Sequence, residues 1–197
     1  MMPFSVVLFD GFETLDAFGP VEIVGKLEQQ VTLGHFSLTG RVVTSSQGVR
    51  VETAPLADLP EGGVLLIPGG MGTRTQVDNV PLIHRLLTLA LHARSVLTVC
   101  TGAALLARTG LLDGLPATTN KLAFEWVTTQ GPKVLWQKRA RWVRADHFYT
   151  SSGVSAGMDM TLGFVADQLG VDVARKIARG IEYVWNDDPD DDPFALA

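Results

Sequence analysis

Short runs of wholly apolar residues alternate along the chain with longer segments in which apolar residues recur at helical spacing. A strand that is covered on both faces carries apolar side chains on both, so such runs predict buried strands. We expect strands at residues 4–9, 31–38, 41–44, 49–53, 64–67, 96–99, 134–136, 140–143 and 148–150. The helical spacing predicts helices at residues 14–26, 80–92, 101–109, 122–128, 155–169 and 171–183, the first with a point of interruption at Gly19-Pro20.

The alternation of strands and helices predicts an α/β fold, in which a mostly parallel sheet lies between helices on both faces. In sheets of this kind, ligands bind beyond the carboxyl ends of the strands. The turn after the first strand, the loop Gly69–Gly72 and Cys100 all come directly after predicted strands. We therefore expect these three segments to lie together at one edge of the sheet.

The 197 residues suffice for one domain of ordinary size, which we place at residues 1–185, followed by an acidic tail at residues 186–197. Hydrophobic residues make up 46% and charged residues 19% of the chain, which excludes a disordered protein. No basic segment precedes the first apolar strand, as a signal peptide would require, and no apolar run approaches the ~18 residues of a membrane span. We expect a soluble, cytoplasmic protein without a membrane partner.

The net charge of −5 comes from the tail alone. Its five aspartates account for the whole excess of negative charge: Asp187, Asp188, Asp190, Asp191 and Asp192. The balanced body offers no basic patch of the kind that a nucleic-acid surface needs, so we expect no nucleic-acid partner. The tail lacks the glycine and the terminal glutamate of an EF-hand, and we interpret it as a solvated acidic terminus rather than a calcium loop.

Cys100 is the only cysteine, so the chain forms neither an internal disulfide nor a cysteine metal site, which suits a reducing cytosol. It stands between an apolar strand and the opening of a helix. A thiol at such a turn faces the positive end of the helix dipole, and this setting lowers a thiol pKa from about 8.5 to roughly 3.5–7.5. The alternative is a buried cysteine that acts as a small apolar side chain.

Two glycine-rich segments match functional motifs only in part. The loop Gly69–Gly72 follows a strand, but Thr75 stands where a dinucleotide fingerprint has its third glycine. The loop either presents N–H donors to a ligand or forms a simple tight turn. Gly153–Gly157 matches the G-x-S-x-G elbow, yet no histidine follows Ser155, as the chain order of the α/β-hydrolases requires. We expect Ser155 to cap a helix and Gly153 to form a wall of the site or a turn.

The remaining candidates are the histidines and one aspartate. The histidines form no metal-ligand pair, and none is obviously placed to serve the thiol: His35, His84, His92 and His147. Asp16 has apolar neighbours, and a semi-buried carboxyl needs hydrogen-bond partners or its pKa rises. Asp16 either caps a helix or carries a proton beside the thiol, and the local sequence favours the cap.

Several short motifs occur in a characteristic order: Ile67-Pro68-Gly69-Gly70, Val99-Cys100-Thr101-Gly102, Ala117-Thr118-Thr119 and the segment from Gly153 to Asp159. Their order and spacing resemble the ThiJ/PfpI superfamily, a relative of the class I glutamine amidotransferases, over essentially the whole chain. The chain is most similar to the isocyanide hydratase branch and to the amidotransferase-like domains of AraC-type regulators. The cues for this branch are Leu15-Asp16 with Gly19-Pro20, Cys100-Thr101-Gly102, Leu111-Leu112-Asp113-Gly114 with the Ala-Thr-Thr motif, and Glu182-Tyr183.

The resemblance implies a flavodoxin-like three-layer α/β sandwich that forms a homodimer. It implies that Cys100 is the nucleophile on a strained elbow and that Asp16 is its acidic partner, where many relatives carry glutamate. The backbone N–H groups of Gly70 and Thr101 would form an oxyanion hole, and the Thr101 side chain would contact the thiol or the ligand. Gly69 and Gly153 complete the expected substrate-binding set.

One departure from the family pattern concerns Asn120, which stands where many relatives have a histidine. A Cys–His pair is the usual way to activate a thiol for peptide or acyl chemistry, so its absence argues against a protease-like activity.

The resemblance therefore favours hydration of an isocyanide, as a small-molecule substrate, to an N-formamide, with no metal or organic cofactor. One alternative is a glyoxalase or deglycase of the same superfamily, against which Asn120 counts. The other is a non-enzymatic ligand sensor or redox sensor, in which Cys100 is oxidised to a sulfinic acid.

Overall fold

The structure, a computed structural model, describes residues 1–195. A seven-stranded sheet forms its centre, in the order β10-β11-β7-β6-β1-β2-β5. Neighbouring strands run parallel except β10 and β11, which are antiparallel. The strands are β1 (Met2–Val7), β2 (Val31–Ser37), β5 (Ala54–Pro55), β6 (Val64–Ile67), β7 (Ser95–Thr98), β10 (Trp142–Ala145) and β11 (Phe148–Ser151).

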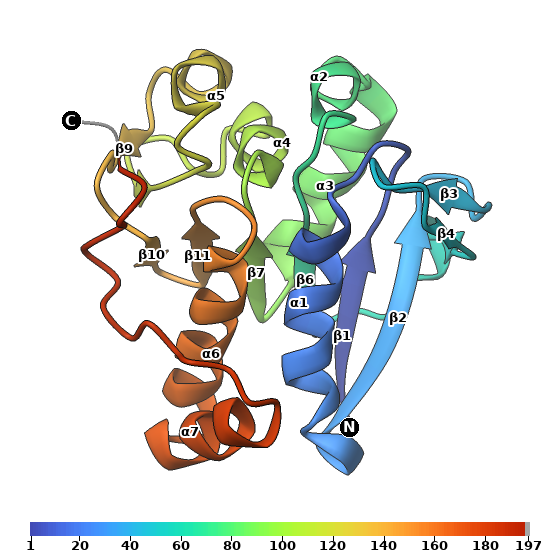
Figure 1. The fold of residues 1–197 in the computed structure, drawn as a ribbon. Coiled ribbons are helices and arrows are strands. Elements are labelled where there is room, and N and C mark those ends of the chain that lie inside the picture. Colours follow the sequence, from blue (N-terminus) through green and yellow to red (C-terminus); the bar gives the residue numbers. More distant parts are fainter. Residues whose placement is uncertain (196–197) are drawn as a thin grey trace.

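Helices cover both faces of this sheet, which confirms the predicted flavodoxin-like three-layer α/β sandwich. One face carries α1 (Thr14–Gly25), α6 (Ala156–Leu169) and α7 (Val171–Gly180), and the other carries α3 (Val80–His92) and α4 (Gly102–Arg108) (Figure 1). The short α2 (Thr73–Gln76) and α5 (Phe124–Gln130) lie near the end of the sheet to which the strand arrows of β1 and β2 point (Figure 1). None of the helices in the described part is long and apolar enough to cross a membrane.

The central strands explain why the pattern of apolar runs was informative. Every residue of β6 and β7 is buried, because helices cover both faces of these strands. The registers of β1, β6 and β7 bring their carboxyl ends to one edge. The turn after β1, the glycine loop after β6 and the turn after β7 therefore meet at that edge, as predicted.

The first helix differs from the prediction, because it continues through Gly19-Pro20 without interruption. Proline has the backbone φ of a helix, so it is compatible with one when packing compensates for the missing N–H. Both residues are buried, and a Cβ at Gly19 would lie 2.8 Å from Cγ of Met158 on α6. The Gly-Pro pair therefore allows α1 and α6 to approach closely.

Short elements outside the regular pattern were not predicted, because two to four residues carry no periodic signal. They are η1 (Glu28–Gln30), β5, η2 (Leu56–Asp58), α2 and β8 (Pro116–Ala117). Two further pairs of strands lie outside the main sheet: β3 (Val43–Thr44) with β4 (Arg50–Val51), and β8 with β9 (Leu135–Trp136).

The acidic tail returns along the body, and the prediction of a solvated terminus is wrong for one of its aspartates. Asp192 is only 3% exposed, whereas the other four tail aspartates are exposed. The tail is held by its backbone: the Pro189 carbonyl accepts from the N–H of Arg141 (2.8 Å), and the N–H of Asp192 donates to the Arg139 carbonyl (2.9 Å). Residues 196–197 of the predicted tail lie outside the described part.

Candidate active site

Cys100 occupies the tight turn between β7 and α4. Its φ is +57°, a left-handed conformation that costs a non-glycine residue roughly 1–2 kcal/mol. Its N–H donates to the Ser152 carbonyl (3.1 Å) and its carbonyl accepts from Thr119 Oγ1 (2.7 Å). Gly102 lets α4 begin against β6, since a Cβ there would lie 2.3 Å from the Ile67 carbonyl oxygen. Backbone strain held in this way concentrates at functional sites.

Asp16 projects from the first turn of α1 toward the same point. It does not cap the helix, because the N-cap position belongs to Glu13, so the prediction of a cap is wrong. The carboxyl is fully buried, and its Oδ2 accepts from the N–H of Gly69 (3.0 Å). Oδ1 has no conventional hydrogen-bond partner among the described residues, although the Cys100 thiol and the Val154 N–H are close enough to affect the pKa of the carboxyl.

Burial raises the pKa of both groups. It raises the pKa of Asp16 to about 7, an effect that the Gly69 N–H opposes only in part. The pKa of the Cys100 thiol also lies above its usual range, because the thiol is buried and the Asp16 carboxylate is beside it. The N–H of Thr101 lowers this pKa by less than burial raises it. The prediction of a lowered thiol pKa is therefore wrong: the resting site holds a neutral thiol next to a carboxyl poised near neutral pH.

The glycine loop after β6 places the polar groups around this pair. The N–H of Gly70, which has φ = +116°, donates to Thr101 Oγ1 (3.0 Å), and Thr73 Oγ1 lies 3.0 Å from that same oxygen. A Cβ at Gly69 would lie 2.5 Å from the Thr101 nitrogen and 2.9 Å from Asp16 Oδ2, so only glycine fits there. The Gly69 N–H thus holds Asp16, and the Gly70 N–H, which we predicted as an oxyanion-hole donor, is instead engaged by Thr101 Oγ1. The Thr101 N–H, the other predicted donor, is close enough to the thiol to lower its pKa.

The segment before α6 forms another wall of the site. Val154 has φ = +48°, which is unusual for a β-branched residue and marks a second strained point beside the pair. A Cβ at Gly153 would lie 2.2 Å from Asn120 Nδ2, so Gly153 makes room for that side chain. Asn120 Oδ1 accepts from the N–H of Ala123 (2.9 Å) at the start of α5. Ser155 stands at the predicted N-cap of α6, but its side chain makes no cap hydrogen bond.

A pocket of about 270 Å³ opens over Cys100. Its rim includes apolar side chains that are strongly exposed, Met71 at 69% and Leu122 at 91%. The residues that line it are Glu13, Gly70, Met71, Arg74, Cys100, Thr101, Asn120, Leu122, Ala123 and Val154. Sequence reasoning missed Arg74, because α2 is too short and too polar to give a helical signal. It also missed Glu13, whose position one turn before Asp16 would have been the signal.

The histidines do not line this pocket. His84 and His92 are exposed on α3, and His147 contacts Asp146 and the Ala90 carbonyl. Within residues 1–195, no group of three or more acidic, histidine or cysteine side chains could hold a metal ion. The titratable groups at the pocket include the Cys100 thiol, the Asp16 carboxyl beneath it and the Arg74 guanidinium.

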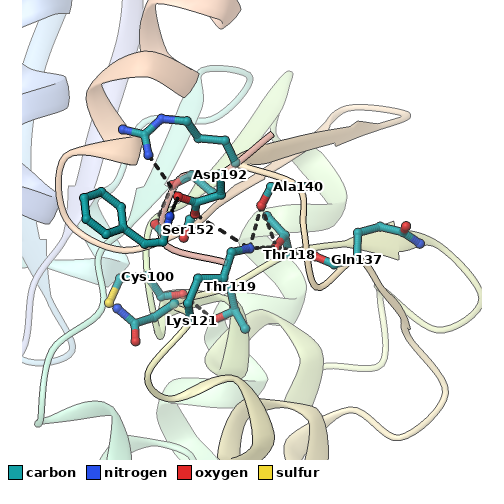
Figure 2. A network of polar contacts seen from close by, with 12 residues as sticks. Cys100, Thr118, Thr119, Lys121, Gln137, Ala140, Ser152 and Asp192 are labelled. Atoms are coloured by element: carbon teal, nitrogen blue, oxygen red, sulfur yellow. Dashed lines mark hydrogen bonds and ion pairs between the residues drawn. The ribbon is translucent and has the colours of Figure 1, made fainter. Parts of the chain in front are cut away.

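A second buried polar group, which we call the ionic cluster, consists of Lys121, Arg141, Asp159 and Asp192. Figure 2 shows two of its members, Lys121 and Asp192, near the elbow. Arg141 forms ion pairs with Asp159 and with Asp192 (3.3 Å for the latter). Lys121 Nζ lies 3.8 Å from Asp192 Oδ2, and burial lowers the pKa of Lys121 to about 8. Figure 2 shows that Thr119, which holds the Cys100 carbonyl, lies close to Lys121.

Comparisons with a family profile and with individual known sequences point to the same family. The profile of the DJ-1/PfpI family matches residues 4–167. The chain is 32% identical over 179 residues to isonitrile hydratase of Pseudomonas putida, which covers 90% of this chain and 76% of that protein. It is 30% identical over 148 residues to the HTH-type transcriptional regulator GbdR of Pseudomonas aeruginosa, of which it spans only 40%.

Solved structures agree with the sequence comparison. A THiJ/PfpI family protein from Pseudomonas syringae superposes with a TM-score of 0.82 at 27% identity, over 98% of this chain and 77% of that one. Drosophila melanogaster DJ-1beta has a TM-score of 0.79 at 17% identity, over 93% of this chain and 99% of that one, which shows a common fold.

Proposed function

The chain belongs to the DJ-1/PfpI family, and from this premise we propose that it hydrates an isocyanide to an N-formamide by means of Cys100 and Asp16. The observation that carries the proposal is the Asp16 carboxyl: it is buried, lacks a conventional partner at Oδ1, and has a pKa of about 7 beside the thiol. A group with such a pKa accepts and returns a proton efficiently at neutral pH. The 32% identity to isonitrile hydratase supports this choice of reaction.

In the proposed first step, the neutral thiol adds across the terminal carbon of the isocyanide. Asp16 in its carboxylate form takes the proton of the Cys100 thiol, and the sulfur forms a bond to that carbon. Asp16 then gives the same proton to the same carbon. The product is a thioimidate, in which the former isocyanide carbon carries one hydrogen and is joined to nitrogen by a double bond. Asp16 ends the step as a carboxylate.

In the second step, water attacks the thioimidate carbon while Asp16 removes a proton from the water. The C–S bond then breaks, and one proton returns to the sulfur while the other goes to the nitrogen. The products are the N-formamide and the free Cys100 thiol. The net reaction is therefore the addition of one water to the isocyanide. The Thr101 N–H, which lowers the pKa of the Cys100 thiol, would donate a hydrogen bond to the sulfur as negative charge develops on it.

The observations weigh against the two alternatives. A glyoxalase or deglycase with the family histidine would need a base at position 120, but the Asn120 carbonyl oxygen is engaged by Ala123. A redox sensor needs a thiolate, whereas burial and Asp16 hold the Cys100 pKa above its usual range. Homodimer formation remains a proposal from the family resemblance, which the molecular mass in solution will test.

The decisive experiment incubates the purified protein with para-nitrophenyl isocyanide and follows the formamide by chromatography. We expect turnover by the native protein and none by Cys100→Ala. In H₂¹⁸O the label should enter the formamide oxygen. A folded native protein that forms no formamide, or a Cys100→Ala variant that forms it at the native rate, would refute the proposal.

A further inference from the structure

Arg74 is a charged side chain in the pocket for which the mechanism has no use. It belongs to α2, and its guanidinium lies 3.5 Å from the ring centroid of Trp126 on α5. One of its nitrogens donates to Thr73 Oγ1 (3.2 Å). The guanidinium is near enough to Cys100 that a negative charge on the sulfur would raise the pKa of Arg74, against the lowering that burial causes. Stacking and the hydrogen bond therefore fix a cation at the mouth of the thiol site.

This guanidinium lacks an anion. In the part of the chain that the structure describes, Arg74 contacts Trp126 and Thr73 and has no carboxylate within ion-pair distance. Arginine remains charged throughout the physiological range, and its planar fork matches a carboxylate in a bidentate manner. The stacked face is occupied, but among residues 1–195 the N–H groups at the edge of the fork have no acceptor besides Thr73.

Besides the polar side chains of Thr101 and Asn120, the pocket has an apolar part that suits an apolar body. Met71, Leu122 and Ala123 present apolar surface, the first two strongly exposed. Glu13 is the only carboxylate of the lining besides the site's own reactive groups, and it already accepts from Gln47 Nε2 (2.7 Å). An apolar or aromatic group that bears one negative charge thus complements the pocket.

We infer that Arg74 determines specificity in this pocket, and that the substrate is an isocyanide whose organic group carries a carboxylate. The inference rests on the proposed function for the isocyanide group of the substrate. The carboxylate group of the substrate is inferred from Arg74 alone. The carboxylate would bind the edge of the guanidinium while the isocyanide carbon reaches the Cys100 sulfur. Trp126 holds the guanidinium in place, so little conformational freedom is lost on binding.

The first test compares para-isocyanobenzoate with its neutral methyl ester. In the native protein, kcat/KM should be higher for the acid. Arg74→Gln should lower kcat/KM for the acid roughly tenfold or more, mainly through KM, and change that of the ester less than about twofold. Arg175→Gln is the matched control: it removes the same charge from an exposed position on α7, at the other end of the molecule, and should change neither value (Figure 1). Equal losses for acid and ester, or no loss for the acid, would overturn the inference.

Two measurements keep the test clear of folding and of the proposed function. Raising the salt concentration should weaken turnover of the acid but not of the ester in the native protein, which needs no variant. Binding of para-formamidobenzoate, measured by calorimetry, should weaken in Arg74→Gln and not in Arg175→Gln. If neither isocyanide is hydrated but this binding still depends on Arg74, the proposed reaction is wrong and the carboxylate site stands. If the ester and the acid are hydrated at equal rates, and Arg74→Gln does not change binding of the product, the proposed reaction stands and the proposed carboxylate site is wrong.

Discussion

Two buried aspartates in this molecule have opposite surroundings. Asp159 of the ionic cluster is fully buried, and it receives hydrogen bonds from Arg141, the Tyr183 hydroxyl (3.0 Å) and the Asn186 N–H (3.0 Å). Asp16 is equally buried, but the Gly69 N–H is its one conventional donor among the described residues. The ionic cluster neutralises its charges, whereas the thiol site leaves a carboxyl without a counter-ion.

The difference distinguishes a structural group from a reactive one. A cation beside a buried carboxylate stabilises its charged form, which for Asp159 opposes the rise in pKa that burial causes, and the pair fastens the chain, in this case the tail to the body. A buried carboxyl that lacks a cation exchanges its proton near neutral pH, because the charged form is desolvated. Burial alone therefore does not predict a role; the number and charge of the partners do.

Removing the Asp16 charge should give the largest effect, in opposite directions for activity and stability. Asp16→Asn should lower kcat by about 10²–10⁴, the usual contribution of a general acid–base group. Because the folded pKa is raised from 3.8 to about 7, the ionised carboxyl destabilises the native state as pH rises through this range. At pH 8 the variant should be more stable: its free energy of unfolding should exceed that of the native protein by up to about 4 kcal/mol.

The measurements are formamide formation and urea unfolding at pH 5 and pH 8. The gain in stability should be larger at pH 8, where the native protein must hold the charge. A variant that is active, or one that is less stable than the native protein at pH 8, contradicts the assignment of Asp16.

Breaking the ionic cluster should cost stability. Arg141→Met leaves two carboxylates buried without their principal cation, which should lower the free energy of unfolding by about 3–5 kcal/mol. The matched control is Arg139→Met, which removes an exposed ion pair with Asp191 and should leave stability almost unchanged. Urea unfolding of both variants at pH 7 makes the comparison, and equal midpoints would show that the cluster does not fasten the tail.

The pH dependence of catalysis should follow Asp16. Since the carboxylate form takes the thiol proton, kcat/KM should fall about tenfold for each pH unit below about 7 and level off above it. Rates of formamide formation between pH 5 and pH 9 give this profile. The residual activity of Asp16→Asn should not show this fall below pH 7. A native profile that is flat across pH 7 would mean that another group accepts the thiol proton.

The smallest effect is expected at position 120. Asn120→His restores the residue common in relatives, but it removes the acceptor for the Ala123 N–H at the start of α5. We expect a loss of about 1 kcal/mol in stability, as for other lost hydrogen bonds, and little gain in turnover. Thermal unfolding and the formamide assay check both parts, and a large gain in turnover would mean that the site lacks a base.

The sequence predicted the parts of the site that depend on local pattern. The apolar runs of β6 and β7 located the edge of the sheet, and the turn after β7 located Cys100. The contact of Asp16 with Gly69 was not predictable from the pattern, because it joins residues 53 positions apart. Arg74 and Asp192 were missed for a related reason: each lies in a polar stretch that looks solvated until distant residues cover it.

The most direct test of the account is the titration of the Asp16 carboxyl, followed by ¹³C NMR in protein labelled at aspartate. The Asp16 resonance is assigned by its absence in Asp16→Asn. We predict a midpoint near pH 7, and a shift of that midpoint when the neighbouring thiol is removed in Cys100→Ala. A midpoint near pH 4 or below, unchanged in Cys100→Ala, would contradict the claim that the two groups share the proton-transfer site.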